Sequence, residues 1–447
     1  MDHDPRAAFL EAASVPLDAS HASGTLARAG EILAAHPEVA TADIHTAATL
    51  GDDEAVRRFL AADPESARAK GGTRGWDALT WLCFSRYLRL DPARSDGFVR
   101  AAEALLDAGA DPNTGFFSEE HQPNPTLESA IYGAAGVAHH PGVTRVLLEH
   151  GADPNDDETP YHAPEGFDDG ALRVLVESGR LTTDSLTTML HRKLDWHHYE
   201  GARWLLEHGA DPNHVSHWGN RALHHALGRD NALAFFELLM DHGADPTLPP
   251  REGRSAFARA ARVGRADVLE LFARRGFRME MERDDAFAAA CALADEARVR
   301  EMMEEDPTLV PRLRGDDPAL LPRFAGAGNT AGVRLLLDLG WDVAAVTDGP
   351  RWVAGDTALH LAVWRDRGET VELLLARGAP LEATTRNGET PLSLAVRAMT
   401  EPSEWTPHES PALVARLLAA GARPESVKRF PTGSPEADAL LRQYGRK

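Results

Sequence analysis

The sequence predicts an all-α solenoid of stacked helix-turn-helix units with short β-hairpin-like turns between them. The first observation is a phrase of two apolar residues, two variable residues, and Gly-Ala-Asp or a close variant. It recurs at residues 105–111, 147–153, 205–211, 239–245, 336–342, 374–380 and 417–423. The second observation is its spacing, which is 34 residues from Gly209 to Gly243 and 33 from Gly243 to Gly276. A fixed period of this size indicates an array in which each unit buries its apolar face against its neighbours.

The elements of one unit can be followed most clearly over residues 355–387. Thr357 is suited to cap a first helix, because its hydroxyl can accept a hydrogen bond from a backbone N–H of the first turn. Leu359 and Leu361 lie on the inward side of that helix. The leucines around Leu374 form the apolar stripe of a second helix. Gly378 then ends this helix by adopting a left-handed conformation, and a polar turn leads to the next unit.

These units resemble the ankyrin repeat family, in which the first helix opens with Thr-Pro-Leu-His-x-Ala. The motif occurs here as TALHLA at 357–362 and TPLSLA at 390–395. Degenerate copies occur at 42–47, 159–163 and 221–226. The ending Gly-Ala-Asp-Pro-Asn recurs at 109–113, 151–155 and 209–213. The combined motif is specific to this family among two-helix repeats.

The repeats divide the chain into three predicted parts. A degenerate N-terminal capping unit is expected over residues 1–41, and an array of about eleven units over 42–430. A C-terminal capping helix is expected over 431–447. Residues 85–97, 114–125 and 400–411 are rich in Pro, Asp and Ser, and they interrupt the period as insertions that we expect to form projecting loops.

The composition limits the classes of partner and the compartment. The net charge of −22 disfavours nucleic acid and anionic membrane surfaces, and no apolar run is long enough to span a bilayer. Cys83 and Cys291 lie in apolar stretches, so we expect both thiols to be buried and unpaired. Unpaired thiols are typical of a reducing compartment. The N-terminus lacks the positive charge of a secretory signal. We therefore expect a cytoplasmic protein, and we expect it to be a monomer.

Eight histidines fall between residues 191 and 225, namely His191, His197, His198, His208, His214, His217, His224 and His225. Imidazole is a frequent ligand of transition metals. However, His208 occupies the same position of the repeat as His150 and His242, and His224 falls in the helix-opening motif. Repeat position therefore explains much of the cluster, and we expect no metal and no cofactor. We also find no nucleophile elbow, no HExxH and no phosphate-binding loop.

The resemblance implies that residues flanking the helix-opening motif, and those after the first helix, line a concave binding face. In this chain they are Arg74, Trp76, His217, Trp218, Asn220, Arg229, Arg251, Arg254, Arg262, Asp356, Trp364, Arg365, Arg386, Asn387 and Arg397. Trp and Arg dominate interaction hot spots, and a row of Arg would favour a partner with an acidic surface.

The sequence therefore predicts a non-catalytic scaffold that binds a protein partner through this face. The alternative is an enzyme, or a protein that binds a small molecule or a metal. Its site would lie in the His-rich segment 191–225 or in the insertions.

Overall fold

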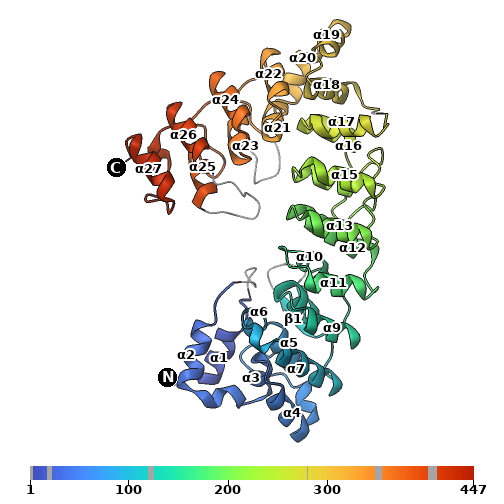
Figure 1. The fold of residues 1–447 in the computed structure, drawn as a ribbon, viewed down its shortest axis with the longest axis vertical. Coiled ribbons are helices and arrows are strands. Elements are labelled where there is room, and N and C mark those ends of the chain that lie inside the picture. The colour runs from blue at the N-terminus through green and yellow to red at the C-terminus, as the bar shows by residue number, and fades with distance from the viewer. Residues whose placement is uncertain are drawn as a thin grey trace. The chain divides into compact units, whose positions relative to one another are not determined.

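The computed structural model describes residues 4–17, 23–118, 125–278, 280–347, 355–400 and 410–446. The chain folds into two compact units, Met1–His217 and Trp218–Lys447, which are described separately below as unit 1 and unit 2. Both consist of short helices packed in pairs, with a single small hairpin among the described residues (Figure 1). The boundary between the units falls at residues 217 and 218, inside the predicted array.

Unit 1 carries thirteen α-helices in its described residues. They are α1 Pro5–Ala13, α2 Ala27–Ala35, α3 Ile44–Thr49, α4 Asp53–Ala62, α5 Ala78–Cys83, α6 Arg86–Leu90, α7 Ser95–Asp107, α8 Ala130–Tyr132, α9 Pro141–Glu149, α10 Thr159–His162, α11 Gly170–Glu177, α12 Thr183–Asp195 and α13 Tyr199–Glu207. Helix α3 packs on α5, α4 on α7, α7 on α9 and α10 on α12, which is the neighbour-to-neighbour order of a solenoid.

Two insertions of unit 1 have regular structure where loops were expected. The first, at 85–97, contains α6, the 3₁₀ turn Pro92–Arg94 and the start of α7. Ser85 caps α6, because its hydroxyl accepts a hydrogen bond from the backbone N–H of Tyr87. In the second, strands β1 Gly115–Ser118 and β2 Thr126–Ser129 pair antiparallel, with Gly115 opposite Ser129. The π-helical turn Gly133–Val137 follows α8. Residues 119–124 of this insertion, and 401–409 of the third, lie outside the described residues.

Unit 2 carries fourteen α-helices in its described residues. They are α14 Ala222–Gly228, α15 Leu233–Asp241, α16 Ala256–Val263, α17 Ala266–Arg274, α18 Arg283–Ala292, α19 Glu296–Glu305, α20 Leu309–Asp316, α21 Leu320–Ala327, α22 Thr330–Asp338, α23 Ala358–Trp364, α24 Gly368–Ala376, α25 Pro391–Thr400, α26 Pro411–Ala419 and α27 Pro435–Gln443. Helix α27 lies in the segment predicted as a closing helix.

The first helices of unit 2 contact one another more closely than the second helices do, so the row curves with its first helices inside. We call α14, α16, α18, α21, α23 and α25, with the turns before them, the first-helix face. The regular order changes around the additional helix α20, because α16 packs against both α18 and α21. Repeats that are distant in the sequence therefore come together on this face.

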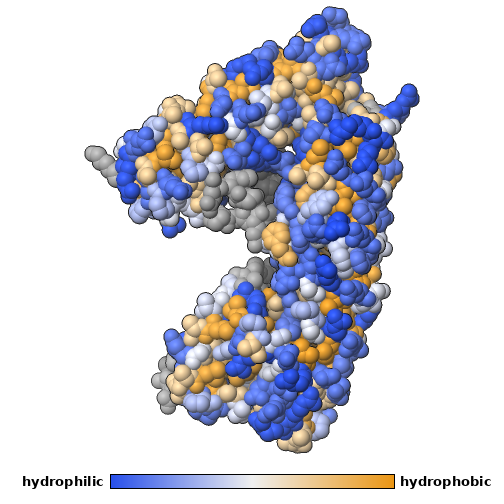
Figure 2. Space-filling model, in the orientation of Figure 1, coloured by the Kyte–Doolittle hydropathy of each residue, from blue (hydrophilic) through white to orange (hydrophobic). Residues whose placement is uncertain are grey.

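The repeated phrase supplies the core of both units. The first leucine of every copy is fully buried, at 0% exposure, in contact with neighbouring helices: Leu105, Leu147, Leu205, Leu239, Leu336, Leu374 and Leu417. Full burial of one such side chain stabilises a fold by roughly 1.5–3 kcal/mol. The glycine of each copy ends the second helix, as at Gly209 and Gly378, where φ is +99° and +78°. Hydrophilic residues cover much of the surface in the view of Figure 2.

The histidine of the helix-opening motif joins consecutive repeats. Thr357 caps α23, and His360 completes a capping box with it. The opposite ring nitrogen of His360, Nε2, donates to the backbone carbonyl of Ala383 at 3.1 Å. His45 and His224 reach the carbonyls of Ala69 and Arg254 in the same way, at 2.9 and 3.2 Å.

Among the described residues, no helix is long and apolar enough to cross a membrane.

Candidate functional site

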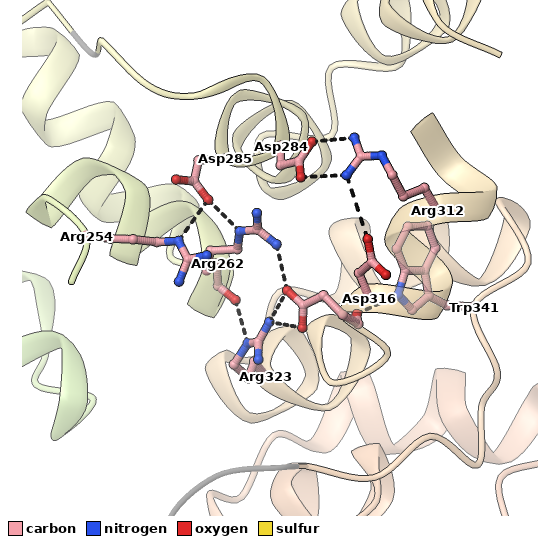
Figure 3. Close-up of polar contacts among 9 residues, drawn as sticks. Arg254, Arg262, Asp284, Asp285, Arg312, Asp316, Arg323 and Trp341 are labelled. Carbon is pink, nitrogen blue, oxygen red and sulfur yellow. Dashed lines mark hydrogen bonds and ion pairs between the residues drawn. The ribbon is translucent and has the colours of Figure 1, made fainter. Parts of the chain in front are cut away.

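Two of the predicted arginines lie within a network of ion pairs at the centre of unit 2 (Figure 3). Arg262, near the end of α16, places Nε 2.6 Å from Asp285 of α18 and Nη1 2.7 Å from Asp317, which follows α20. Arg254 also contacts Asp285, at 3.2 Å. Arg323 of α21 holds Asp317 from the other side at 2.6 Å. The guanidinium of Arg262 is therefore occupied by two carboxylates of its own unit.

The same network extends to the outer edge of α18. Arg312 binds both carboxylate oxygens of Asp284, at 2.7 and 2.8 Å, and this bidentate hydrogen bonding lowers the pKa of Asp284. The indole N–H of Trp341 donates to the carbonyl of Asp317 at 3.3 Å. These contacts connect α16, α18, α20 and α21 in the region where the regular packing order of the helices changes.

A second network joins repeats that are far apart in the sequence. Asp230, in the turn between α14 and α15, lies 2.5 Å from Arg367 and 3.3 Å from Arg365, in the turn between α23 and α24. Arg265 approaches the same carboxylate to 3.4 Å and donates to the carbonyl of Asn231 at 2.8 Å. Arg365, a predicted partner-binding residue, therefore lies beside an internal counter-ion. The predicted row of arginines is largely neutralised within the protein.

Arg74 and Trp76, the predicted residues nearest the N-terminus, have internal contacts in unit 1. Arg74 pairs with Glu11 of α1 at 2.8 Å, and its guanidinium lies 4.8 Å from the ring centroid of Trp76. Trp76 is only 5% exposed and stacks on Phe116 of β1 with ring centroids 4.5 Å apart. Both residues attach the first helix and the hairpin to the stack, so the structure places them in the interior and not on an open surface.

The first turns of unit 2 present several exposed residues of the predicted set. Trp218 is 42% exposed, and Arg229 and Arg251 are exposed as well, whereas Asn220 is half-buried. The backbone N–H of Arg251 donates to the carbonyl of Gly219 at 2.8 Å, which holds the turn of Trp218 against the next one. His217 is exposed at the end of unit 1.

The remaining predicted residues gather at the C-terminal end of the first-helix face. Arg397 of α25 places its guanidinium 4.9 Å from the ring centroid of Trp364 and its Nε 3.0 Å from Glu389. Burial, with repulsion from Glu389, raises the pKa of Asp356 to about 6. Asn387 lines a cavity of about 420 Å³ together with Arg397, and Arg386 is exposed on the same turn.

The histidines of segment 191–225 are used separately by the fold. His208 donates from Nδ1 to the carbonyl of Trp204 at 2.7 Å, and His150 and His242 make the same bond to Val146 and Leu238, at 2.9 Å each. The shared role is to satisfy a carbonyl at the end of a second helix. Within the described part of the chain, no three His, Cys, Asp or Glu side chains are grouped so that they could hold a metal ion.

The sequence patterns did not reveal the acidic residues that pair with Arg254, Arg262 and Arg365. They also did not reveal two further cations that line the cavity. The first group is Asp230, Asp285 and Asp317, and the second is Lys428 and Arg429. The one available signal was the position of Asp230 directly after a first helix. Arg262 and Asp285 are 23 positions apart, and Arg367 and Asp230 are 137 positions apart, so no local pattern reveals these contacts.

The paired helices, the glycine-terminated second helices and the curved first-helix face define a helical repeat protein. Comparison with known proteins specifies the repeat: a family model described as ankyrin repeats in three copies matches residues 190–283, and one of ankyrin repeats in many copies matches residues 321–375. These two segments of the chain therefore consist of ankyrin repeats.

Cyclin-dependent kinase 4 inhibitor B of Homo sapiens is similar to part of the chain, at 39% identity over 83 residues. The match covers 18% of this chain and 59% of that relative. The repeats and this likeness support a role in protein interaction.

Proposed function

We propose that this protein is a non-catalytic scaffold that binds a protein partner through the first-helix face of unit 2. The observation that carries the proposal is the exposed indole of Trp218, on a turn that is hydrogen-bonded to the turn of Arg251. Trp and Arg on a rigid support are the residues that contribute most to protein interfaces. A turn fixed by its neighbour also loses little conformational freedom when a partner binds.

The two thiols of the chain are unsuited to nucleophilic catalysis. Cys83 and Cys291 are both free and buried. Burial raises the pKa of Cys291 to about 12 and raises that of Cys83 as well. A thiol must ionise to act as a nucleophile, and neither of these does so near neutral pH.

Replacing Trp218 and Arg229 together by Ala tests the proposal. Both side chains are exposed, so we expect the helical content and the melting temperature to stay unchanged, while capture of a partner from the lysate of the source organism is lost. A matched control replaces Tyr444 and Arg274 by Ala, because these are also one exposed aromatic residue and one exposed Arg, away from the first-helix face. Undiminished capture by the Trp218/Arg229 variant, or equal loss in the control, would contradict the proposal.

A further inference from the structure

A cavity of about 420 Å³ lies at the C-terminal end of unit 2, between α25 with the turn before it and the segment that leads to α27. One wall is the turn before α25, with Asn387 and Glu389, and a second wall is α25 itself, with Arg397. The third wall is the segment 426–432 that leads to α27, with Lys428 and Arg429. The volume lies in the range of about 300–1,000 Å³ in which proteins hold small ligands or single side chains.

The charge of this cavity is opposite to that of the chain. Its lining contains three cations, Arg397, Lys428 and Arg429, and one carboxylate, Glu389, in a protein of net charge −22. Arg397 is paired with Glu389 and stacked on Trp364. Lys428 and Arg429 are exposed, and neither forms an ion pair with any other residue that the structure describes. The third wall of the cavity therefore carries two positive charges, those of Lys428 and Arg429, that are not paired with a carboxylate among the described residues.

The walls of the cavity are fixed to one another. The hydroxyl of Thr390 donates to that of Ser426 at 3.0 Å, which connects the start of α25 to the third wall. Thr432 donates to Asp438 of α27 at 2.7 Å. The ammonium of Lys428 reaches the turn before α25, since it lies 3.8 Å from where a Cβ on Gly388 would stand. Walls that are held in place before binding lose little conformational freedom when a ligand arrives.

We propose that this cavity receives a carboxylate side chain from an acidic peptide segment of a protein partner, bound by Arg397, Lys428 and Arg429. The inference rests on the proposed function and names the chemistry of the partner at one end of the face. Arg presents a planar donor group that matches a carboxylate, and the amide of Asn387 can bond to the peptide backbone. The two excess cations would also attract inorganic phosphate, so the test below includes phosphate as a competitor.

Fluorescence anisotropy with a labelled hexaglutamate peptide tests the cavity directly on the full-length chain. We expect binding that weakens as salt is added, and that falls at least about tenfold when Lys428→Glu and Arg429→Glu are combined. The control combines Arg274→Glu and Arg275→Glu, which makes the same change in net charge on α17 and after it, away from the cavity. The control should bind the peptide almost as the unchanged protein does, and a labelled hexalysine peptide should not bind at the cavity.

Three results would overturn the inference. They are absence of hexaglutamate binding, equal loss in both double variants, and displacement of the peptide by inorganic phosphate at equal concentration. The proposed function is tested separately, because the Trp218/Arg229 variant should keep hexaglutamate binding. If the peptide fails to bind while partner capture still depends on Trp218, the cavity inference fails and the proposed function stands.

Discussion

Replacing Asp230 by Asn tests whether the charged network of unit 2 holds distant repeats together. Asp230 joins the turn after α14 to the turn before α24, through Arg365 and Arg367. Asn preserves the shape of the side chain and tolerates the positive φ of +55° at this position. The substitution therefore removes one negative charge and leaves three arginines, including Arg265, around a neutral amide.

The magnitude follows from burial. The side chain of Asp230 is 12% exposed and that of Arg265 is 7% exposed, so this pair is shielded from water. Removing one partner of a buried pair typically costs about 3–5 kcal/mol. Arg365 and Arg367 are 35% and 34% exposed, so water compensates part of their loss. We expect a loss of about 2–3 kcal/mol in the free energy of unfolding.

Urea unfolding of the full-length chain, followed by circular dichroism, measures this loss. The control is Glu270→Ala, which removes an exposed pair with Arg274 at 3.9 Å and should cost less than about 0.5 kcal/mol. If Asp230→Asn lowers the free energy of unfolding by no more than the control does, the ion pairs of Asp230 do not stabilise the arrangement of the repeats, and the reasoning is refuted.

Two further predictions concern pH. Hydrogen bonds to Glu158 and Glu165 outweigh the effect of burial and raise the pKa of His162 to about 9. Its stabilisation of about 3 kcal/mol is fully present below pH 6.5 and is lost as the pH rises through 9, so His162→Gln should remove that dependence from thermal unfolding curves. An unchanged pH profile would exclude the ion-paired state of His162. The pKa of Asp356 is raised to about 6, chiefly by burial, so this carboxyl destabilises the fold as the pH rises from about 4 to 6. Asp356→Asn should therefore raise the melting temperature at neutral pH and leave it nearly unchanged at pH 4, and a lower melting temperature at neutral pH would contradict this.

Local patterns predicted the repeat and its packing because each unit contacts mainly its neighbours. The leucine, glycine and histidine positions of the phrase each have one repeated role, as Leu205, Gly209 and His208 illustrate. The same reasoning placed Arg262 and Arg365 on a binding face. It did not foresee that Asp317 and Asp230 would neutralise them, because α20 and the altered packing of α16 bring those carboxylates near.

The insertions show a second limit of local reasoning. Pro, Asp and Ser in residues 85–97 suggested a loop, yet the same residue types begin helices, and Ser85 does so for α6. The cavity was beyond prediction for a different reason. Its third wall, with Lys428 and Arg429, belongs to a segment without repeat character, whose position depends on how α27 closes the stack.

Hydrogen–deuterium exchange on the complex with a captured partner tests the central claim most directly, because it reports which backbone amides the partner covers. We expect slower exchange in the turn around Trp218 and Arg251 and along the first helices of unit 2, with unchanged exchange in the second helices α15, α17 and α24. Protection confined to those second helices, or to unit 1, would contradict binding through the first-helix face.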